Sequence, residues 1–391
     1  MIGVIRFLKK LPHTFCPILF SAVLLSFWGC LAIYNASMKF ENPIDYTSKQ
    51  FIWLGVSVFV SILISRIHIK RYLEFIPWLF GAGVLSLIAV IFWGQSINHM
   101  RGWFHTEYFS IQPSEFCKPF FCLFTCWYYR YLVEEETSEA KVYIKLLLSV
   151  SPVLVLLVLQ PDFGTLLIFI LCFLIIYWTH GGSSKFILWS GAAAIPFMLA
   201  VLYKFPYVFK RLEGFWNPEK YSSTSGFHLL QLERAIASGG FWGRSFGKSL
   251  WSEGYLPLTH NDSIYASFCE SLGFIGGFLL IAVFTGALYA AYKKCRRMEN
   301  DLYGYSLFSL VFCLTIQAYI HMSVNVQLLP PTGITLPFIS YGGSSLLSSF
   351  IIVGLCKSII SSEKQDLLES NESSEVEPLG ENIDSTESGS L

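Results

Sequence analysis

The stretch "EFIPWLFGAGVLSLIAVIFWG", residues 74–94, decides the class of fold. Apart from Glu74 it carries no charged side chain, and its length is the roughly 20 residues that a helix needs to cross a bilayer. Similar apolar runs recur from Pro17 to Ile360. Hydrophobic residues make up 53% of the 391 residues and charged residues only 14%, against about 25% charged in soluble proteins. We therefore predict an all-α polytopic membrane protein.

The apolar runs predict ten transmembrane helices and a large extracytoplasmic loop, residues 204–263, between the seventh and the eighth. The basic start "RFLKKLPH" lacks a small-residue cleavage site, so we expect the first helix to be retained. After residue 360 the chain turns acidic, which predicts a transmembrane domain over 1–360 and a disordered cytoplasmic tail over 361–391. The predicted spans lie near residues 17–37, 50–67, 74–94, 114–132, 143–159, 163–179, 186–203, 264–292, 304–325 and 338–360.

Charges in the short loops predict the orientation. One set of loops and chain ends holds 16 Lys and Arg residues, whereas the opposite short loops hold only Lys39, Lys49 and Arg101. Because basic residues concentrate on the cytoplasmic side, we expect both termini in the cytoplasm and residues 204–263 outside. The expected location is the cytoplasmic (inner) membrane.

The ten cysteines form no Cys-x-x-Cys pair, and most lie in or near apolar runs. We interpret them as small buried apolar residues, not as metal or redox ligands. Cys122 and Cys126 share a helix face at a spacing of four, which predicts helix packing.

Polar motifs cluster on the predicted outer side, and each alone has a structural explanation. Ser114 and Asp162 can cap helices, and Glu115 in a first turn suits the helix dipole. Glu115 and Lys118, however, lie on one helix face inside a span, where ionisable residues usually face a polar interior and mark function. The motifs are "SIQPSEFCKPFF" (110–121), "QPDFGT" (160–165) and "LPPTGITLPFISYGGSS" (329–345).

Two segments on this side suggest a polar cavity or a binding surface. The Pro- and Gly-rich 329–345 stretch is tolerated at membrane depth only if it is buried in protein or lines a wet cavity. The 204–263 loop mixes cations with aromatics, which fits a solvated loop, attraction to anionic lipid headgroups, or a pyrophosphate site rich in Arg. These three readings stay open at this point.

The motifs, taken in order, resemble the SEDS family (shape, elongation, division and sporulation), which contains RodA and FtsW. The resemblance is slightly stronger to RodA. The resemblance covers about residues 15–360. It rests on "RGW" (101–103), "QPSEFCK" (112–118), "QPDFGT", "SGFHLLQ" (225–231), "LPLTHND" (256–262) and "NVQLLPPTGITLPFISYGGSS" (325–345).

The resemblance implies a peptidoglycan glycosyltransferase that polymerises lipid II into β-1,4 glycan strands outside the membrane, with a class B penicillin-binding protein transpeptidase as partner. Asp262 matches the family's essential aspartate and would be the general base of an inverting displacement, since partial desolvation raises a carboxyl pKa and improves the base. No cofactor is certain; side-chain cations or a divalent ion such as Mg²⁺ would stabilise the leaving diphosphate. We expect no nucleic-acid partner. Expected substrate-binding residues are Glu115, Lys118, Arg101, Arg211, His260, Asp162, Gln160, Ser340 and Gly342.

This chain departs from the family pattern at several positions. Where the family has Glu, Thr and Phe around its aspartate, Leu258, Asn261 and Ser263 stand here. Ser271 replaces a second acid next to the retained Glu270, and Gln327 replaces a glycine. We expect an active but diverged enzyme. A flippase or transporter for lipid-linked precursors, another lipid-linked sugar ligase, and a structural scaffold remain alternatives.

Overall fold

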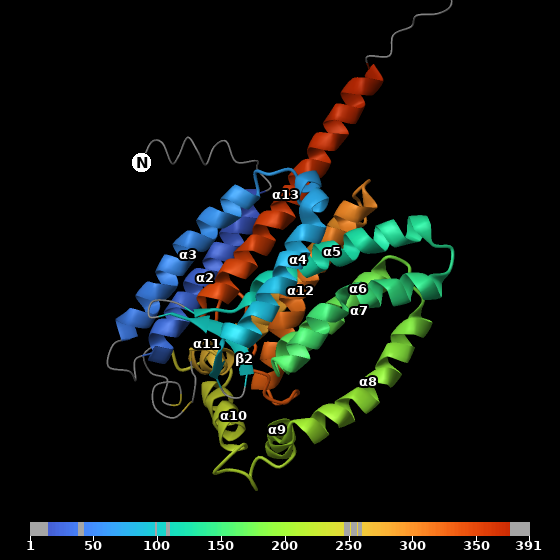
Figure 1. Cartoon of the computed structure of the whole chain (residues 1–391). Coiled ribbons are helices and arrows are strands. Elements are labelled where there is room, and N and C mark those ends of the chain that lie inside the picture. The colour runs from blue at the N-terminus through green and yellow to red at the C-terminus, as the bar shows by residue number, and fades with distance from the viewer. Residues whose placement is uncertain are drawn as a thin grey trace, which may run out of the picture.

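The computed structural model describes residues 15–37, 43–97, 100–106, 110–245, 251, 256 and 260–375. Long helices run side by side through most of these residues (Figure 1). They are α2 (Phe15–Ser37), α3 (Pro43–Ile64), α4 (Ile69–Trp93), α5 (Pro113–Glu135), α6 (Glu139–Leu159), α7 (Phe163–Thr179), α8 (Ser184–Lys204), α11 (Ile264–Cys295), α12 (Asp301–Asn325) and α13 (Gly343–Glu375).

Each of these helices coincides with one predicted span, which confirms the all-α polytopic class. Within the described residues, eight are long and apolar enough to cross a membrane, and α7 is a shorter apolar helix. Of the ten helices, α5 is the one that belongs to neither group. It carries the buried charges Glu115 and Lys118 in its first two turns.

A small antiparallel sheet and two short helices lie at one end of the bundle (Figure 1). The sheet is β1 (Gln95–Ile97), β2 (Met100–His105) and β3 (Ser110–Ile111), in that order. The predicted 204–263 loop contains α9 (Pro206–Trp216) and α10 (Phe227–Gly239). We call this end the Asp262 end and the opposite one the Glu375 end. The all-helical prediction missed the sheet, since strands this short show no extended alternation of apolar and polar residues.

The core of the bundle is α12 and α13. α13 packs against α3, α12 and α5, and α12 also packs against α11 and α7. α8 stands apart and packs mainly against α7 and α9 (Figure 1). Its apolar side chains, such as Leu188 at 74% exposed and Ile195 at 65%, suit contact with lipid, where an apolar surface carries no penalty.

α13 extends beyond the predicted span into the tail that the sequence assigned to disorder. Contacts with distant residues explain the difference for residues 362–366. The Ser362 hydroxyl accepts a hydrogen bond from the backbone N–H of Ile69 at 2.9 Å, and Glu363 accepts one from the backbone N–H of Glu299 at 2.7 Å. Asp366 pairs with Lys70 at 3.0 Å. Residues 376–391 lie outside the described part of the chain.

Candidate functional site

A buried ion pair occupies the start of α5. Lys118 Nζ lies 2.6 Å from Glu115 Oε2, and the two side chains are 3% and 7% exposed. Lys118 also donates a hydrogen bond to Gln317 Oε1 of α12 at 2.6 Å, and Gln317 Nε2 donates to the carbonyl of Thr335 at 3.0 Å. The network satisfies charges that would otherwise be costly inside a bundle. It also joins α5 and α12 to the 329–345 segment.

Asp162 has both of the roles considered for it. Its Oδ1 accepts a hydrogen bond from the backbone N–H of Thr165 at 3.1 Å and so caps α7. Its Oδ2 accepts from Gln112 Nε2 at 3.3 Å, just before α5. Burial raises the pKa of Asp162 above its ordinary value. Ser114 does not cap α5, whose N-cap is Gln112; among the described residues the buried Ser114 hydroxyl has no hydrogen-bond partner.

Asp262 lies directly before α11, with Ser263 as N-cap. Its side chain is partly buried, and burial raises the pKa of Asp262 to about 6, while the charge of Arg211 acts in the opposite direction. Its backbone carbonyl accepts a hydrogen bond from Asn325 Nδ2 at 2.9 Å. Asn325 Oδ1 accepts in turn from the N–H of Ala266 at 3.1 Å. Asn325 therefore fixes both sides of the turn that presents Asp262.

One face of α12 links the ion pair to Asp262. Gln317, His321 and Asn325 are spaced by four residues and so share a face. Gln317 contacts Lys118, His321 Nδ1 lies 2.7 Å from the carbonyl oxygen of Ile334, and Asn325 holds the Asp262 turn. None of these three residues was predicted from the sequence as part of the site. Polar side chains recurring at helical spacing in an apolar span were the available signal.

The end of the 329–345 segment packs onto the residues around Asp262. Ser340 Oγ donates a hydrogen bond to the carbonyl of Asn261 at 3.0 Å, and the Tyr341 N–H donates to the carbonyl of His260 at 2.9 Å. The His260 ring lies 5.7 Å from the Tyr341 ring. The Gly342 N–H donates to Gln50 Oε1 of α3 at 3.3 Å. Ser340 is buried, so here the segment is covered by protein.

Arg211 reaches the same region from α9. Its Nη1 lies 3.5 Å from the carbonyl of Pro331, and its guanidinium lies 5.4 Å from the centre of the Tyr207 ring. Arg101 is exposed on β2, and its backbone N–H donates to the carbonyl of Gln160 at 3.4 Å. The buried side chain of Gln160 donates to the carbonyl of Leu87, which gives it a packing role.

Two departures from the family pattern, Gln327 and Ser271, and the retained Glu270 make structural contacts. Gln327 adopts a φ of 59°, in the left-handed region that favours glycine, and its Nε2 donates to the carbonyl of Leu229 in α10 at 2.9 Å. Glu270 is fully buried and accepts from the N–H of Trp251 at 2.9 Å. Ser271 Oγ accepts from Asn35 Nδ2 at 3.3 Å. Leu258 lies outside the described residues.

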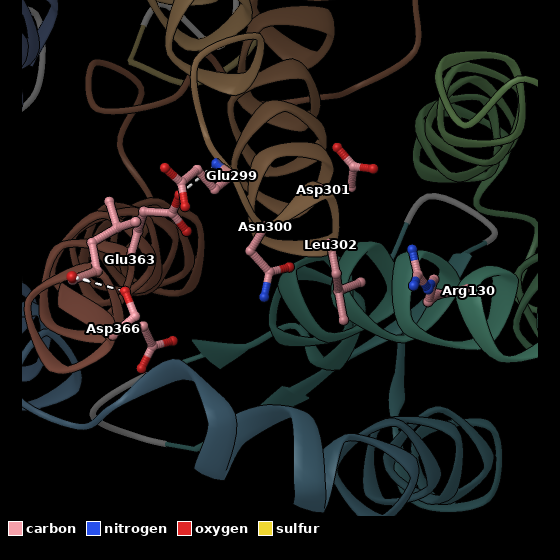
Figure 2. A pocket seen from close by; sticks show the side chains of 9 residues that line it. Arg130, Glu299, Asn300, Asp301, Leu302, Glu363 and Asp366 are labelled. Atoms are coloured by element: carbon pink, nitrogen blue, oxygen red, sulfur yellow. Dashed lines mark hydrogen bonds between the residues drawn. The ribbon is translucent and has the colours of Figure 1, made fainter. Parts of the chain in front are cut away.

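A pocket of about 630 Å³ opens at the other, Glu375 end. Figure 2 shows it between the start of α12, α13 and α5. The Glu363 carboxylate is held there by the backbone N–H of Glu299, and Arg130 lies on the side of α5. The pocket is remote from Asp262, so it is no part of the candidate site.

Comparisons with known proteins agree on one family. The model of a family described as cell cycle protein, FtsW/RodA/SpoVE, matches residues 16–365. A probable peptidoglycan glycosyltransferase FtsW of Coxiella burnetii is 32% identical over 343 residues, which cover 84% of this chain and 91% of that protein. Stage V sporulation protein E of Bacillus subtilis is 28% identical over 358 residues, covering 89% and 96%.

Solved structures share the fold. A chain from a peptidoglycan synthase complex, in work on the coordination of polymerization and crosslinking, aligns with a TM-score of 0.72 and 22% identity, covering 91% of this chain and 99% of that one. The rod shape determining protein RodA of Thermus thermophilus aligns with a TM-score of 0.65 and 22% identity, covering 90% and 98%. Proteins with the FtsW, SpoVE and RodA names thus all resemble this chain.

Proposed function

The chain belongs to the FtsW/RodA/SpoVE family of cell cycle proteins, and we propose that it is a peptidoglycan glycosyltransferase that polymerises lipid II. The observation that carries the proposal is Asp262. It is a partly buried carboxylate at one end of a membrane bundle, with a pKa of about 6 and the cation Arg211 acting on it. The names of the sequence relatives support the same reaction.

Glycan polymerisation needs a base and a stabilised leaving group. The 4-hydroxyl of the acceptor sugar attacks the anomeric carbon of the donor, its proton passes to the Asp262 carboxylate, and the bond to the polyprenyl diphosphate breaks. A single displacement converts the α-linked donor into a β linkage. A base with a pKa near 6 is mostly ionised at pH 7 and still accepts a proton well.

Arg211 is the cation that we assign to the departing diphosphate, since a guanidinium can bind two phosphate oxygens at once. Its contact with the carbonyl of Pro331 keeps it over the 329–345 segment. A divalent cation such as Mg²⁺, carried in by the diphosphate, would act in the same way. Activity measured with and without a chelator separates the two assignments.

The remaining residues of the expected site have supporting roles in this proposal. Glu115 and Lys118 hold α5 against α12, while Ser340 and the backbones of His260 and Gly342 hold the segments that flank Asp262. Substrate contacts are assigned to the exposed side chain of Arg101 and to Arg211, which reach the surface of the Asp262 end.

We also propose the orientation and the partner. The excess of basic residues in one set of loops supports cytoplasmic termini and an external Asp262 end, in the cytoplasmic membrane. A reporter enzyme fused after α13 and active only outside the cell should stay silent. The partner is a class B penicillin-binding protein transpeptidase, supported by the likeness to a chain from a peptidoglycan synthase complex.

The deciding experiment supplies lipid II to the purified protein, alone and with a cognate penicillin-binding protein. A ladder of β-1,4 glycan strands is expected, and Asp262→Asn should abolish it while folding and partner binding persist. Glu369→Gln, an exposed acid at the Glu375 end, is the matched control and should leave the ladder intact. Full synthesis by Asp262→Asn would overturn the assignment of the base. Lipid II movement across vesicles without any polymer would favour a flippase.

A further inference from the structure

Three cysteines from three different helices converge inside the bundle. The sulfur atoms of Cys122 in α5, Cys172 in α7 and Cys313 in α12 all lie within 4.8 Å of one another, and all three residues are buried. The cluster lies one helical turn below the buried ion pair, since Cys122 follows Lys118 by four residues and Cys313 precedes Gln317 by four. We call these three residues the thiol cluster.

We propose that the thiol cluster binds one soft, thiophilic metal ion, of the class that includes Cu(I), Zn(II) and Cd(II). Thiolates select these ions over hard cations. Metal–sulfur bonds of about 2.3 Å hold sulfur atoms about 3.8–4.0 Å apart, so the thiol cluster has to contract by less than about 1 Å. Side-chain rotation about χ1 supplies movements of this size without displacing the helices.

Charge decides how such an ion would be held. Each thiol loses its proton to solvent as its sulfur bonds to the metal, so three thiolates and a divalent ion leave one net negative charge. A net charge is costly within a membrane bundle unless it is compensated. The Lys118 ammonium is close enough to act electrostatically on Cys172 and Cys313. Because Lys118 is already paired with Glu115 at 2.6 Å, its positive charge offsets the negative charge of the metal site only in part.

A neighbouring cysteine shows what distinguishes the thiol cluster from ordinary packing. Cys126 is the next residue along the same face of α5 and is equally buried. Its sulfur faces the hydroxyl of Ser309 at 3.5 Å. Cys126 is thus matched in helix and burial but does not belong to the described group of convergent ligands.

Metal binding would join α7 to α5 and α12, the two helices that carry the ion-pair network. α5 supplies Lys118 and α12 supplies Gln317, and the metal would fix their separation one turn away. The inference does not rest on the glycosyltransferase proposal, because the geometry of the thiol cluster is independent of Asp262.

The test uses the full-length protein, reduced and purified in detergent, with Cd²⁺ alone as the probe. Ultraviolet sulfur-to-cadmium charge-transfer absorption reports binding, and mass spectrometry of the metal retained after gel filtration gives the stoichiometry. Wild type and Cys126→Ser should each retain one Cd²⁺ per chain. Cys122→Ser, Cys172→Ser and Cys313→Ser should each bind at least tenfold more weakly.

Two results would overturn the proposal. One is that wild type retains no Cd²⁺, and the other is that all three thiol-cluster variants retain as much Cd²⁺ as wild type. X-ray absorption on the wild-type complex requires no variant and so covers the case of a misfolded substitution. It should count three sulfur neighbours around the metal. A shell of oxygen and nitrogen neighbours would place the ion elsewhere and reject the thiol cluster as its site.

Discussion

The rate of glycan synthesis should depend on pH in a way set by Asp262. Burial raises the pKa of Asp262 to about 6, and a general base works only when it is deprotonated. Activity is therefore present above this pKa and lost as the pH falls through it. With a pKa of about 6, the ionised fraction is roughly 0.9 at pH 7 and roughly 0.1 at pH 5. The rate should fall about tenfold between these two values.

Substitution of Arg211 should move the midpoint of this profile. Its positive charge lowers the pKa of Asp262 against the effect of burial. Arg211→Gln should therefore shift the acidic midpoint upward, by about 0.5–1 pH unit for a partly screened charge. Arg211→Lys keeps the charge and should keep the midpoint. Lys210→Gln removes an exposed cation from the adjacent position of α9 and is the matched control.

The assay is the initial rate of strand synthesis from saturating lipid II at constant ionic strength, between about pH 3 and pH 8 so that an ordinary carboxyl midpoint would also be observed. Protein stability is checked at each pH by thermal unfolding. A flat profile in wild type, or a midpoint near the ordinary carboxyl value of about 4, would refute the role of a desolvated base. An Arg211→Gln midpoint equal to that of wild type would refute the electrostatic link alone.

Other expectations concern stability and positioning. Lys118→Met leaves Glu115 buried without its partner and should lower the free energy of unfolding by about 3–5 kcal/mol, measured by thermal unfolding in detergent; adding Glu115→Gln should recover part of the loss. Asn325→Ala removes the hydrogen bonds that hold the turn before α11. It should lower kcat with little change in KM, while the pH midpoint stays near 6. Gln327→Gly should leave the unfolding temperature nearly unchanged, because relief of the left-handed backbone offsets a lost hydrogen bond, whereas Gln327→Val should lower stability by about 1–2 kcal/mol.

The spacing of residues along the chain predicted those features that depend on sequence neighbours, namely the helices and the faces of those helices. The apolar runs predicted the long helices, and the spacing of Glu115 and Lys118 predicted that both lie on one helix face, because residues three apart are neighbours on a helix. Features formed by distant residues were not predictable in this way. Gln317 reaches Lys118 from 199 residues away, and the thiol cluster draws one cysteine from each of three helices. No spacing within one helix encodes such contacts.

The same long-range contacts explain the helix that replaces part of the predicted tail. The sequence of residues 361–375 is polar and acidic, so local composition favours disorder. The backbone N–H groups of Ile69 and Glu299 donate hydrogen bonds to the side chains of Ser362 and Glu363, respectively. These tertiary partners stabilise the part of the helix that includes residues 362–366.

The ion pair on α5 also bears on how the chain enters the membrane. α5 is made early, and its Lys118 precedes its partner Gln317 by 199 residues. During synthesis the helix therefore reaches the insertion machinery with two charges and without the residue that completes their network. Partition of α5 into lipid alone would be unfavourable. The hydrogen bond from Lys118 to Gln317 can form only after α12 has been made, so the polar centre of the bundle is completed by a helix that comes late in the chain.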